Sequence, residues 1–460
     1  MTAENESAPN AALKDMDRSR LWHAMSPYRG GTAEPMIAAE AKGAWITDAE
    51  GKRYLDGMSG LWCVNVGYGR EELAKAAYDQ LVKMSYYPLS QSHEPAILLA
   101  EQLSDWLGGD YVVFFSNSGS EANETAFKIA RQYHEQTGTH GKTKFVSRYR
   151  AYHGNTMGAL AATGQAQRKY KYEPLAAGFV HVRPPDAYRR PDGMTAEQFY
   201  RLCAREIEET ILWEGKETVA GVIMEPAITG GGVIVPDTFY MEEVERICRR
   251  HNVLLIIDEV ICGFGRSGMN FGHHNYGIEP DIVTMAKGLT SGYLPLSATA
   301  VKRSVYEAFQ SEESYAHFRH INTFGGNPAS CALALANLRI MKDERLVERS
   351  KRLGERLGAG LAELAGHPLV GDVRRFGFLA GVELVADRHS KRPLDVSAVN
   401  RIIADCKEKG LLIGKNGETV AGFNNVLTIC PPLSSTDDDL AFLLRTLADA
   451  LEPYGETEGL

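Results

Sequence analysis

Short apolar runs alternate with longer stretches of helical period between about residue 70 and residue 301 of this 460-residue chain. The run EELAKAAYDQLVKM repeats apolar residues three and four positions apart, which is typical of an amphipathic helix. Six apolar runs of strand length separate such stretches, at residues 111–115, 144–148, 220–225, 253–258, 281–286 and 297–301. Strands that alternate with helices predict an α/β fold with a mostly parallel sheet covered by helices on both faces.

The two ends of the chain carry different patterns. Residues 43–56 predict a small hairpin with its turn at 48–51. After about residue 330 a long helical stretch is followed by strand-like FGFLAGVELV and GLLIG and by a final helix, DDLAFLLRTLADALEPY. We expect a smaller α+β lobe built from both chain ends. The predicted division is 1–68 for the N-terminal part of this lobe, 69–330 for the large domain and 331–460 for the C-terminal small domain.

Composition excludes several classes of protein. The net charge is -9 and no dense basic run is present, which argues against nucleic-acid binding. Seven scattered cysteines form no CxxC pair, so we expect reduced thiols rather than a disulfide framework or a metal site. No apolar run reaches membrane-spanning length, and the first twenty residues lack the apolar stretch of a signal peptide. These features predict a cytoplasmic globular enzyme.

The segment YVVFFSNSGSEANETAF predicts a strand, a Ser/Gly turn and a helix. Gly119 allows a ligand to approach the backbone closely. The amides of Gly119 and Ser120, with the Ser120 hydroxyl, would lie at the positive end of the helix, where phosphate groups bind. The alternative is an ordinary turn in which Ser120 is the N-cap of the helix.

The segment VLLIIDEVICGFGRSG places Asp258 at the carboxyl end of a buried strand. A buried carboxylate needs a cationic partner, and active sites of open α/β sheets lie at this end of the strands. Gly263, Gly265 and Gly268 form a GxGxxG pattern. We reject a dinucleotide site because no helical period follows these glycines.

Two further segments carry candidate chemistry. In RYRAYHGNTMGA, the ring of Tyr152 could lie flat on a cofactor ring, or Tyr152 could be a core residue. In TMAKGLTSGYLPL, Lys287 is the single local charge and follows a buried strand. Burial disfavours the ammonium form and leaves an amine that attacks carbonyl groups. The alternative is a lysine that extends from the rim of the core to solvent.

Together these residue types meet the needs of pyridoxal phosphate (PLP), which requires a lysine for its aldehyde, an acid for its pyridine nitrogen, a phosphate site and a surface for its ring. From about residue 40 to its end the sequence resembles the class III aminotransferases, the ω-transaminase family of fold type I PLP enzymes. The segments IIDEVICGFGRSG and TMAKGLTSGYLPL carry this resemblance.

The resemblance implies roles for individual residues. Lys287 would anchor PLP as a Schiff base and move the substrate proton, and Asp258 would bind the pyridine nitrogen. Val260 would pack under the ring, opposite Tyr152. Further cofactor contacts would come from Ser118, Gly119, Ser120, His153 and Glu225, and substrate contacts from Trp62, Tyr87 and Tyr152. Thr323 would reach the phosphate of the neighbouring subunit, since the family builds its two active sites across a homodimer interface. The resemblance also allows a tetramer.

The stretches GLWCVNVG and SYYPLSQSHEP are similar to the branch that uses pyruvate as amino acceptor. The implied reaction moves an amino group from an ω-amino acid or primary amine, such as taurine or β-alanine, to pyruvate by a ping-pong mechanism. Lys415 stands where the family usually has an arginine for the substrate carboxylate. Lys415 could bind that carboxylate or be a solvated loop residue, with Arg266 as the next candidate. The rival functions are an aminomutase or racemase on the same fold, and a nicotinamide dehydrogenase.

Overall fold

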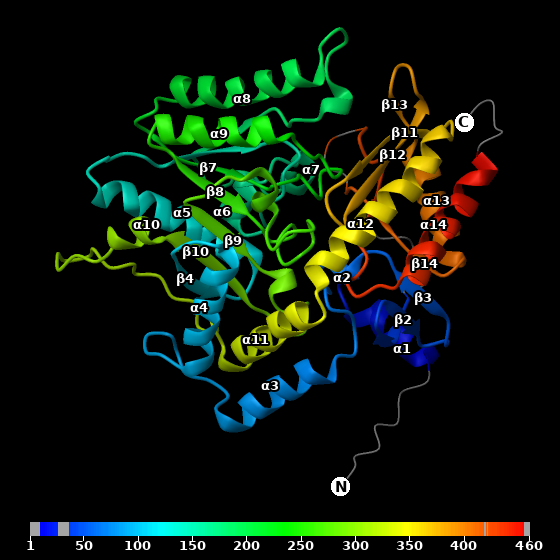
Figure 1. Cartoon of the computed structure of the whole chain (residues 1–460), viewed down its shortest axis with the longest axis horizontal. Coiled ribbons are helices and arrows are strands. Elements are labelled where there is room, and N and C mark those ends of the chain that lie inside the picture. Colours follow the sequence, from blue (N-terminus) through cyan, green and yellow to red (C-terminus); the bar gives the residue numbers. More distant parts are fainter. Residues whose placement is uncertain (1–9, 26–35, 418–419, 421, 455–460) are drawn as a thin grey trace.

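A seven-stranded sheet forms the centre of the structure, a computed structural model that describes residues 10–25, 36–417, 420 and 422–454 (Figure 1). Its order is β4-β10-β9-β8-β7-β5-β6. In that order the bounds are Tyr111–Ser116, Ser297–Lys302, Ile282–Met285, Leu254–Asp258, Val219–Met224, Lys144–Arg148 and Phe179–Val182. β10 is antiparallel to both neighbours and the other pairs are parallel. The six predicted strands are confirmed, and β6, a four-residue edge strand, was not predicted.

Helices cover both faces of this sheet. α8 (Ala196–Trp213) and α9 (Thr238–Arg250) lie side by side on one face, and α5 (Gly119–Gln136) lies on the other (Figure 1). Side chains of β8 alternate between the two resulting cores: Leu255 and Ile257 pack with α8 and α9, and Leu254 and Ile256 pack with α5. This two-sided burial explains why the central strands read as continuous apolar runs.

The strand ends bring distant segments to one edge of the sheet. β5, β7, β8 and β9 are parallel, so their carboxyl ends lie at the same edge. β4 is antiparallel to β10, as β9 is, and therefore ends at that edge too. The residues that follow these five strands are in position to form one site.

Two smaller sheets lie beside the central one. The first has the order β1-β2-β3-β14, where β1 is Ala38–Lys42, β2 Trp45–Asp48, β3 Arg53–Asp56 and β14 Leu411–Leu412. β2 and β3 form the predicted hairpin, and β3 pairs in parallel with β14, so both chain ends meet in this sheet (Figure 1). The second has the order β11-β12-β16-β15, with bounds Val370–Arg375, Ala380–Asp387, Val426–Ile429 and Gly414–Lys415. β13 (Arg392–Pro393) pairs with β12. The domain boundaries at 68 and 330 stay a prediction.

The long helical stretch after residue 330 is two helices, α11 (Pro328–Asp343) and α12 (Leu346–Glu363). The chain turns between them at Arg345, whose φ of 51° is left-handed. The final helix, α14 (Asp437–Leu451), is confirmed, whereas α13 (Val396–Glu408) was not predicted. The other α-helices are α1 (Asn10–Arg20), α2 (Ser59–Trp62), α3 (Glu71–Lys83), α4 (Glu94–Leu107), α6 (Met157–Ala162), α7 (Ala166–Lys169) and α10 (Arg303–Glu307).

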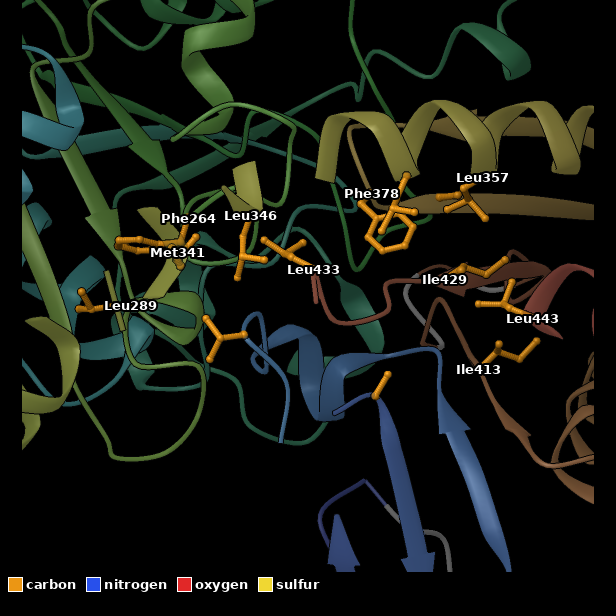
Figure 2. Packing of buried hydrophobic residues seen from close by; sticks show 14 of the residues in the cluster. Phe264, Leu289, Met341, Leu346, Leu357, Phe378, Ile413, Ile429, Leu433 and Leu443 are labelled. Carbon is orange, nitrogen blue, oxygen red and sulfur yellow. The ribbon is translucent and has the colours of Figure 1, made fainter. Parts of the chain in front are cut away.

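One apolar core joins the central sheet to the C-terminal elements (Figure 2). It runs from Phe264 and Leu289, next to the candidate site, through Leu346 and Leu433 to Phe378. The segments that follow Val260 and Lys287 are therefore held by the same packing. No helix in the part of the chain that the structure describes is long and apolar enough to cross a membrane.

Candidate active site

Lys287 follows β9 and begins a short 3-10 turn over Lys287–Leu289. Its φ of 40° lies in the left-handed region, where residues other than glycine are uncommon. The side chain is half-buried, and within the described ranges it forms no ion pair or hydrogen bond. Burial raises the pKa of the Cys63 thiol, and the nearby charge of Lys287 opposes that rise. The Lys287 amine thus has no ionic partner in the described part of the chain. Lys287 also lines a cavity at the ends of the central strands.

Asp258 ends β8 and is only 3% exposed. Its Oδ2 accepts a hydrogen bond from Asn123 Nδ2 at 2.8 Å and lies 2.9 Å from His153 Nδ1. Its Oδ1 accepts from the backbone N–H of Val260 at 3.0 Å. The Asn123 amide is oriented in turn by Thr284, whose hydroxyl donates to Asn123 Oδ1 at 2.7 Å. The carboxylate is held on both oxygens by donors and still borders the cavity.

Two serines at the start of α5 make different hydrogen bonds. Ser118 is the N-cap, because its Oγ accepts from the N–H of Glu121 at 3.2 Å. Ser120 Oγ instead donates to Asn155 Oδ1 at 3.0 Å and accepts from the N–H of Asn155 at 3.1 Å. The alternative in which Ser120 caps the helix is therefore wrong. Gly119 and Ser120 begin α5 and line the cavity, where the helix amides favour an anion.

Two glycines allow close packing beside this helix end. A Cβ on Gly119 would lie 2.9 Å from Val260 Cγ2. A Cβ on Gly154 would lie 2.5 Å from Ser120 Oγ, and the φ of Gly154 is 142°. Neither position accepts a side chain unless its neighbours move. Glycine at both positions therefore allows these segments to pack closely where they line the cavity.

Glu225 follows β7 and is buried. Its Oε1 accepts from the N–H of Tyr152 at 3.1 Å, and its Oε2 accepts from the N–H and the hydroxyl of Thr229 at 3.0 and 2.9 Å. Burial raises the pKa of Glu225, and the charge of Asp258 adds to this rise. Burial likewise raises the pKa of Tyr152. Glu225 thus holds the backbone that carries Tyr152.

These segments enclose a cavity of about 130 Å³. The predicted residues that line it are Gly119, Ser120, Tyr152, His153, Glu225, Asp258, Val260 and Lys287. The other lining residues are Asn123, Gly154, Ile261, Cys262 and Ala286. Asn123 was not predicted, although a polar residue between Ala122 and Ala126 on the apolar face of a helix is a signal for a buried hydrogen bond.

Five predicted site residues do not line this cavity. Ser118 caps α5 and points to solvent, and Tyr87 and Thr323 are exposed on the surface. Trp62 packs against a small buried cluster, and its Nε1 is buried without a hydrogen-bond partner in the described residues. Lys415 is half-buried in β15. Their roles stay predictions.

The alternative that Arg266 binds the substrate carboxylate is wrong. Arg266 is fully buried. Its Nη1 donates to the carbonyl oxygens of Phe378 and Pro431 at 3.0 and 2.6 Å, and its Nη2 to Ser59 Oγ and Asn65 Oδ1 at 3.2 and 3.0 Å. These bonds tie together four separate segments. The role of Arg266 is therefore structural, and both terminal nitrogens already have partners.

The cavity fits PLP chemically. It combines a lysine amine, a carboxylate held by donors and a helix N-terminus beside two glycines, which suit an aldehyde, a pyridine nitrogen and a phosphate. The GxGxxG segment does not open a helix, since residues 260–268 form turns and the next element is the 3-10 turn Gly272–Tyr276. This agrees with the rejection of a dinucleotide site.

Comparison with known proteins agrees with this chemistry. The family model for Aminotransferase class-III matches residues 28–451. The chain belongs to the class III aminotransferases. It is therefore a PLP-dependent transaminase with the type I fold.

Similar proteins extend over nearly the whole of this aminotransferase. An uncharacterized aminotransferase, YhxA, of Bacillus subtilis is 61% identical over 96% of this chain and 97% of its own. The taurine–pyruvate aminotransferase of Bilophila wadsworthia is 41% identical over 98% of this chain and 99% of its own. The crystal structure of the ω-transaminase from Pseudomonas jessenii in complex with PMP has a TM-score of 0.92 and 35% identity, covering 97% of this chain and 100% of that one.

Proposed function

We propose that this class III aminotransferase transfers the amino group of an ω-amino acid or primary amine, such as taurine or β-alanine, to pyruvate and releases alanine. The observation that carries the choice of acceptor is the 41% identity, over 98% of the chain, to a taurine–pyruvate aminotransferase. The mechanism is ping-pong: the donor leaves its nitrogen on the cofactor, and pyruvate then collects it.

The cavity supports a division of roles among its residues. When bound, PLP supplies an aldehyde that bonds to amines and a ring that withdraws electrons from the substrate carbon. Lys287 anchors the aldehyde and then moves the substrate proton with its amine. Asp258 keeps the pyridine nitrogen protonated, and its own position is fixed by Asn123 and His153. The helix amides at Gly119 and Ser120 bind the phosphate.

The two half-reactions test the function. The purified enzyme should lose the visible band of its lysine-bound PLP with β-alanine or taurine. Pyruvate should restore the band with one alanine released per site. An aminomutase or racemase would not release alanine from pyruvate, and a nicotinamide dehydrogenase would show no such band. A band restored by 2-oxoglutarate but not by pyruvate would contradict the proposed acceptor.

All seven cysteines lie in described segments and are free thiols, six of them buried. Free thiols in a chain of this size are typical of a reducing compartment. This supports a cytoplasmic location.

We also propose that two copies form a homodimer with active sites at their interface. Exposed apolar side chains within residues 78–98 and 321–324 support this: Tyr78, Leu81, Val82, Tyr86, Tyr87, Leu89, Ile97, Leu98, Ile321 and Phe324 are all more than a third exposed. The ring of Tyr86 lies 6.2 Å from that of Phe324, and the Tyr86 hydroxyl donates to the carbonyl oxygen of Thr323 at 2.9 Å. Exposed apolar groups in such numbers are typical of a protein interface. Thr323 is exposed beside Phe324, so a second copy that covers these side chains would also contact Thr323.

Subunit mixing tests the shared site. Lys287→Ala and a Thr323→Tyr variant should each be nearly inactive as homodimers. After subunit exchange, activity should recover to at most about a quarter of the wild-type value, because half of the dimers are mixed and each holds one site with both residues intact. The control is each variant exchanged with itself. If exchange is verified by mass and activity does not recover, each site is built from one chain.

Lys415 is expected to bind the carboxylate of pyruvate. Removing one charged hydrogen-bond partner costs about 1.5–3 kcal/mol, so Lys415→Ala should lower kcat/KM for pyruvate by roughly ten- to hundred-fold. Lys415→Arg should keep this value or raise it, since a guanidinium binds a planar carboxylate through two parallel bonds. Steady-state kinetics with a neutral amine donor measures both. Unchanged constants in Lys415→Ala would show that Lys415 has no role in binding the acceptor.

A further inference from the structure

Arg168 lies on the outer side of the candidate active site. Its guanidinium carbon is 4.6 Å from the centre of the Tyr152 ring, and Tyr152 lines the cavity. Arg168 belongs to the short helix α7 and is itself half-buried, outside the lining residues. A cation stacked on an aromatic ring is partly desolvated and held in a defined plane. Arg168 therefore presents a fixed positive charge one ring away from the cavity.

Arg168 Nε is anchored, whereas within the described residues its two terminal nitrogens have no strong hydrogen-bond acceptor. Arg168 Nε donates to Gln165 Oε1 at 2.6 Å, and the buried Gln165 donates to the carbonyl oxygen of Arg150 at 2.8 Å. Nη1 has a weak contact, 3.8 Å from Met25 Sδ, and thioether sulfur is a poor acceptor. Nη2 lies 3.5 Å from the position of a Cβ on Gly417. Among the described residues, both terminal nitrogens thus have capacity to bind another group.

Three neighbouring arginines, in contrast, pair with carboxylates. Arg150 Nη1 donates to Asp186 at 2.6 Å, and both Arg189 and Arg374 pair with the buried Glu383. Among the residues that the structure describes, no carboxylate pairs with Arg168. Its charge lowers the pKa of Tyr152, against the larger effect of burial. Of these four arginines, Arg168 is the one that stacks on a cavity residue and has no carboxylate partner among the described residues.

We propose that Arg168 binds the acid group of the amine donor, a carboxylate or sulfonate, through Nη1 and Nη2. This inference rests on the proposed function, because it concerns the donor half of that reaction. Two parallel N–H groups suit both acids, and such charged bonds are stronger than neutral ones. Arg168 is a specificity-determining residue in this role, and chemistry at Lys287 does not depend on it.

The position of Arg168 outside the cavity lining favours a donor over the acceptor. Pyruvate carries its carboxylate on the carbon next to the reacting carbon, so its acid stays inside the cavity. An ω-amino acid or amino sulfonate carries its acid at least one carbon further from the reacting carbon. Arg168 contacts the lining residue Tyr152 but is not itself a lining residue, so it favours the acid that is further from the reacting carbon.

The test uses the PLP-loaded enzyme and measures the donor half-reaction alone by stopped-flow absorbance. The donors are β-alanine, taurine and n-propylamine, the last being close in size to β-alanine but without the acid. Arg168→Met keeps a long side chain over Tyr152 and removes the charge. Arg168→Lys keeps the charge and removes the paired N–H groups. Arg205→Met is the matched control, since it removes one exposed arginine of α8, paired with Glu209, away from the cavity.

Arg168→Met should lower the second-order rate constant for β-alanine and taurine by about ten- to hundred-fold. The constant for n-propylamine and the pyruvate half-reaction should change little, and Arg168→Lys should fall between wild type and Arg168→Met. Arg205→Met should match wild type with every substrate.

Three results would overturn the proposal: equal losses for n-propylamine and β-alanine, a loss confined to pyruvate, or no loss with either acid. A wild-type enzyme that reacts with n-propylamine but with neither acid would overturn it as well. Since pyruvate is absent from the donor half-reaction, an error in the proposed acceptor would leave this test intact.

Discussion

Lys287→Ala should fold and hold PLP without a covalent bond, yet lose nearly all turnover. The side chain is half-buried, borders the cavity and has no ionic partner within the described ranges, so its removal breaks no ion pair or hydrogen bond there. General acid–base groups contribute about 10²- to 10⁴-fold to rates, and the loss should be at least that large. Single-turnover kinetics with a neutral amine measures it.

Borohydride reduction of the wild-type enzyme followed by peptide mass spectrometry locates the anchor. The cofactor should be found on the peptide that contains Lys287. Lys302→Ala is a suitable control, because Lys302 ends the neighbouring strand β10 and lies outside the cavity lining. PLP attached to a different lysine, or normal turnover in Lys287→Ala, would refute the assignment.

The central sheet was predictable because its strands are buried on both faces. Leu254 to Ile257 form an uninterrupted apolar run, and alternate residues fill separate cores. The predicted site residues are close to the ends of such strands, so the parallel topology that predicts the strands also predicts that Asp258 and Lys287 meet. The apolar runs thus predicted both the central strands and the position of the site at their ends.

Elements without a continuous apolar run were not predicted from the sequence. β6 is four residues long and mostly half-buried at the sheet edge, and β11 reads VGDVRR with charged residues in its interior. Arg345 interrupts a helical period that looks continuous, because its left-handed φ leaves no trace in the apolar pattern. Short edge strands and single-residue turns depend on tertiary contacts that a sequence pattern does not contain.

The missed site residues have a related explanation. Asn123 and Asn155 act through partners 30 or more positions away in the chain, His153, Asp258 and Ser120. Arg168 is part of a four-residue helix, and its stacking on Tyr152 depends on how α7 folds back. A single sequence shows which residue types are present near a strand end. It does not show which polar side chains from other segments complete their hydrogen bonds.

Asp258→Asn should keep the fold and lose about 3–5 kcal/mol of transition-state stabilisation, the cost of removing one partner of a buried charge pair. This corresponds to roughly 10²–10⁴ in the half-reaction rate. A neutral amide cannot keep the pyridine nitrogen protonated, whereas the Asp258 carboxylate can. Asp281→Asn is the matched control: Asp281 precedes β9 at the opposite edge of the same sheet and accepts from the N–H of Leu255 at 2.8 Å.

The hydrogen bonds around Asp258 add a second, separable effect. Oδ2 accepts from Asn123 and Oδ1 from the N–H of Val260, so an asparagine amide must face a donor whichever way it is turned. Asn123 cannot rotate to relieve this, because Thr284 donates to its oxygen. An unsatisfied buried donor costs about 1–3 kcal/mol, so the thermal midpoint should fall while the visible spectrum still reports bound PLP. The single-turnover rate of PLP-loaded Asp258→Asn, measured well below that midpoint, isolates the chemical loss. A near-wild-type rate there would mean that Asp258 stabilises the fold and does not assist the reaction.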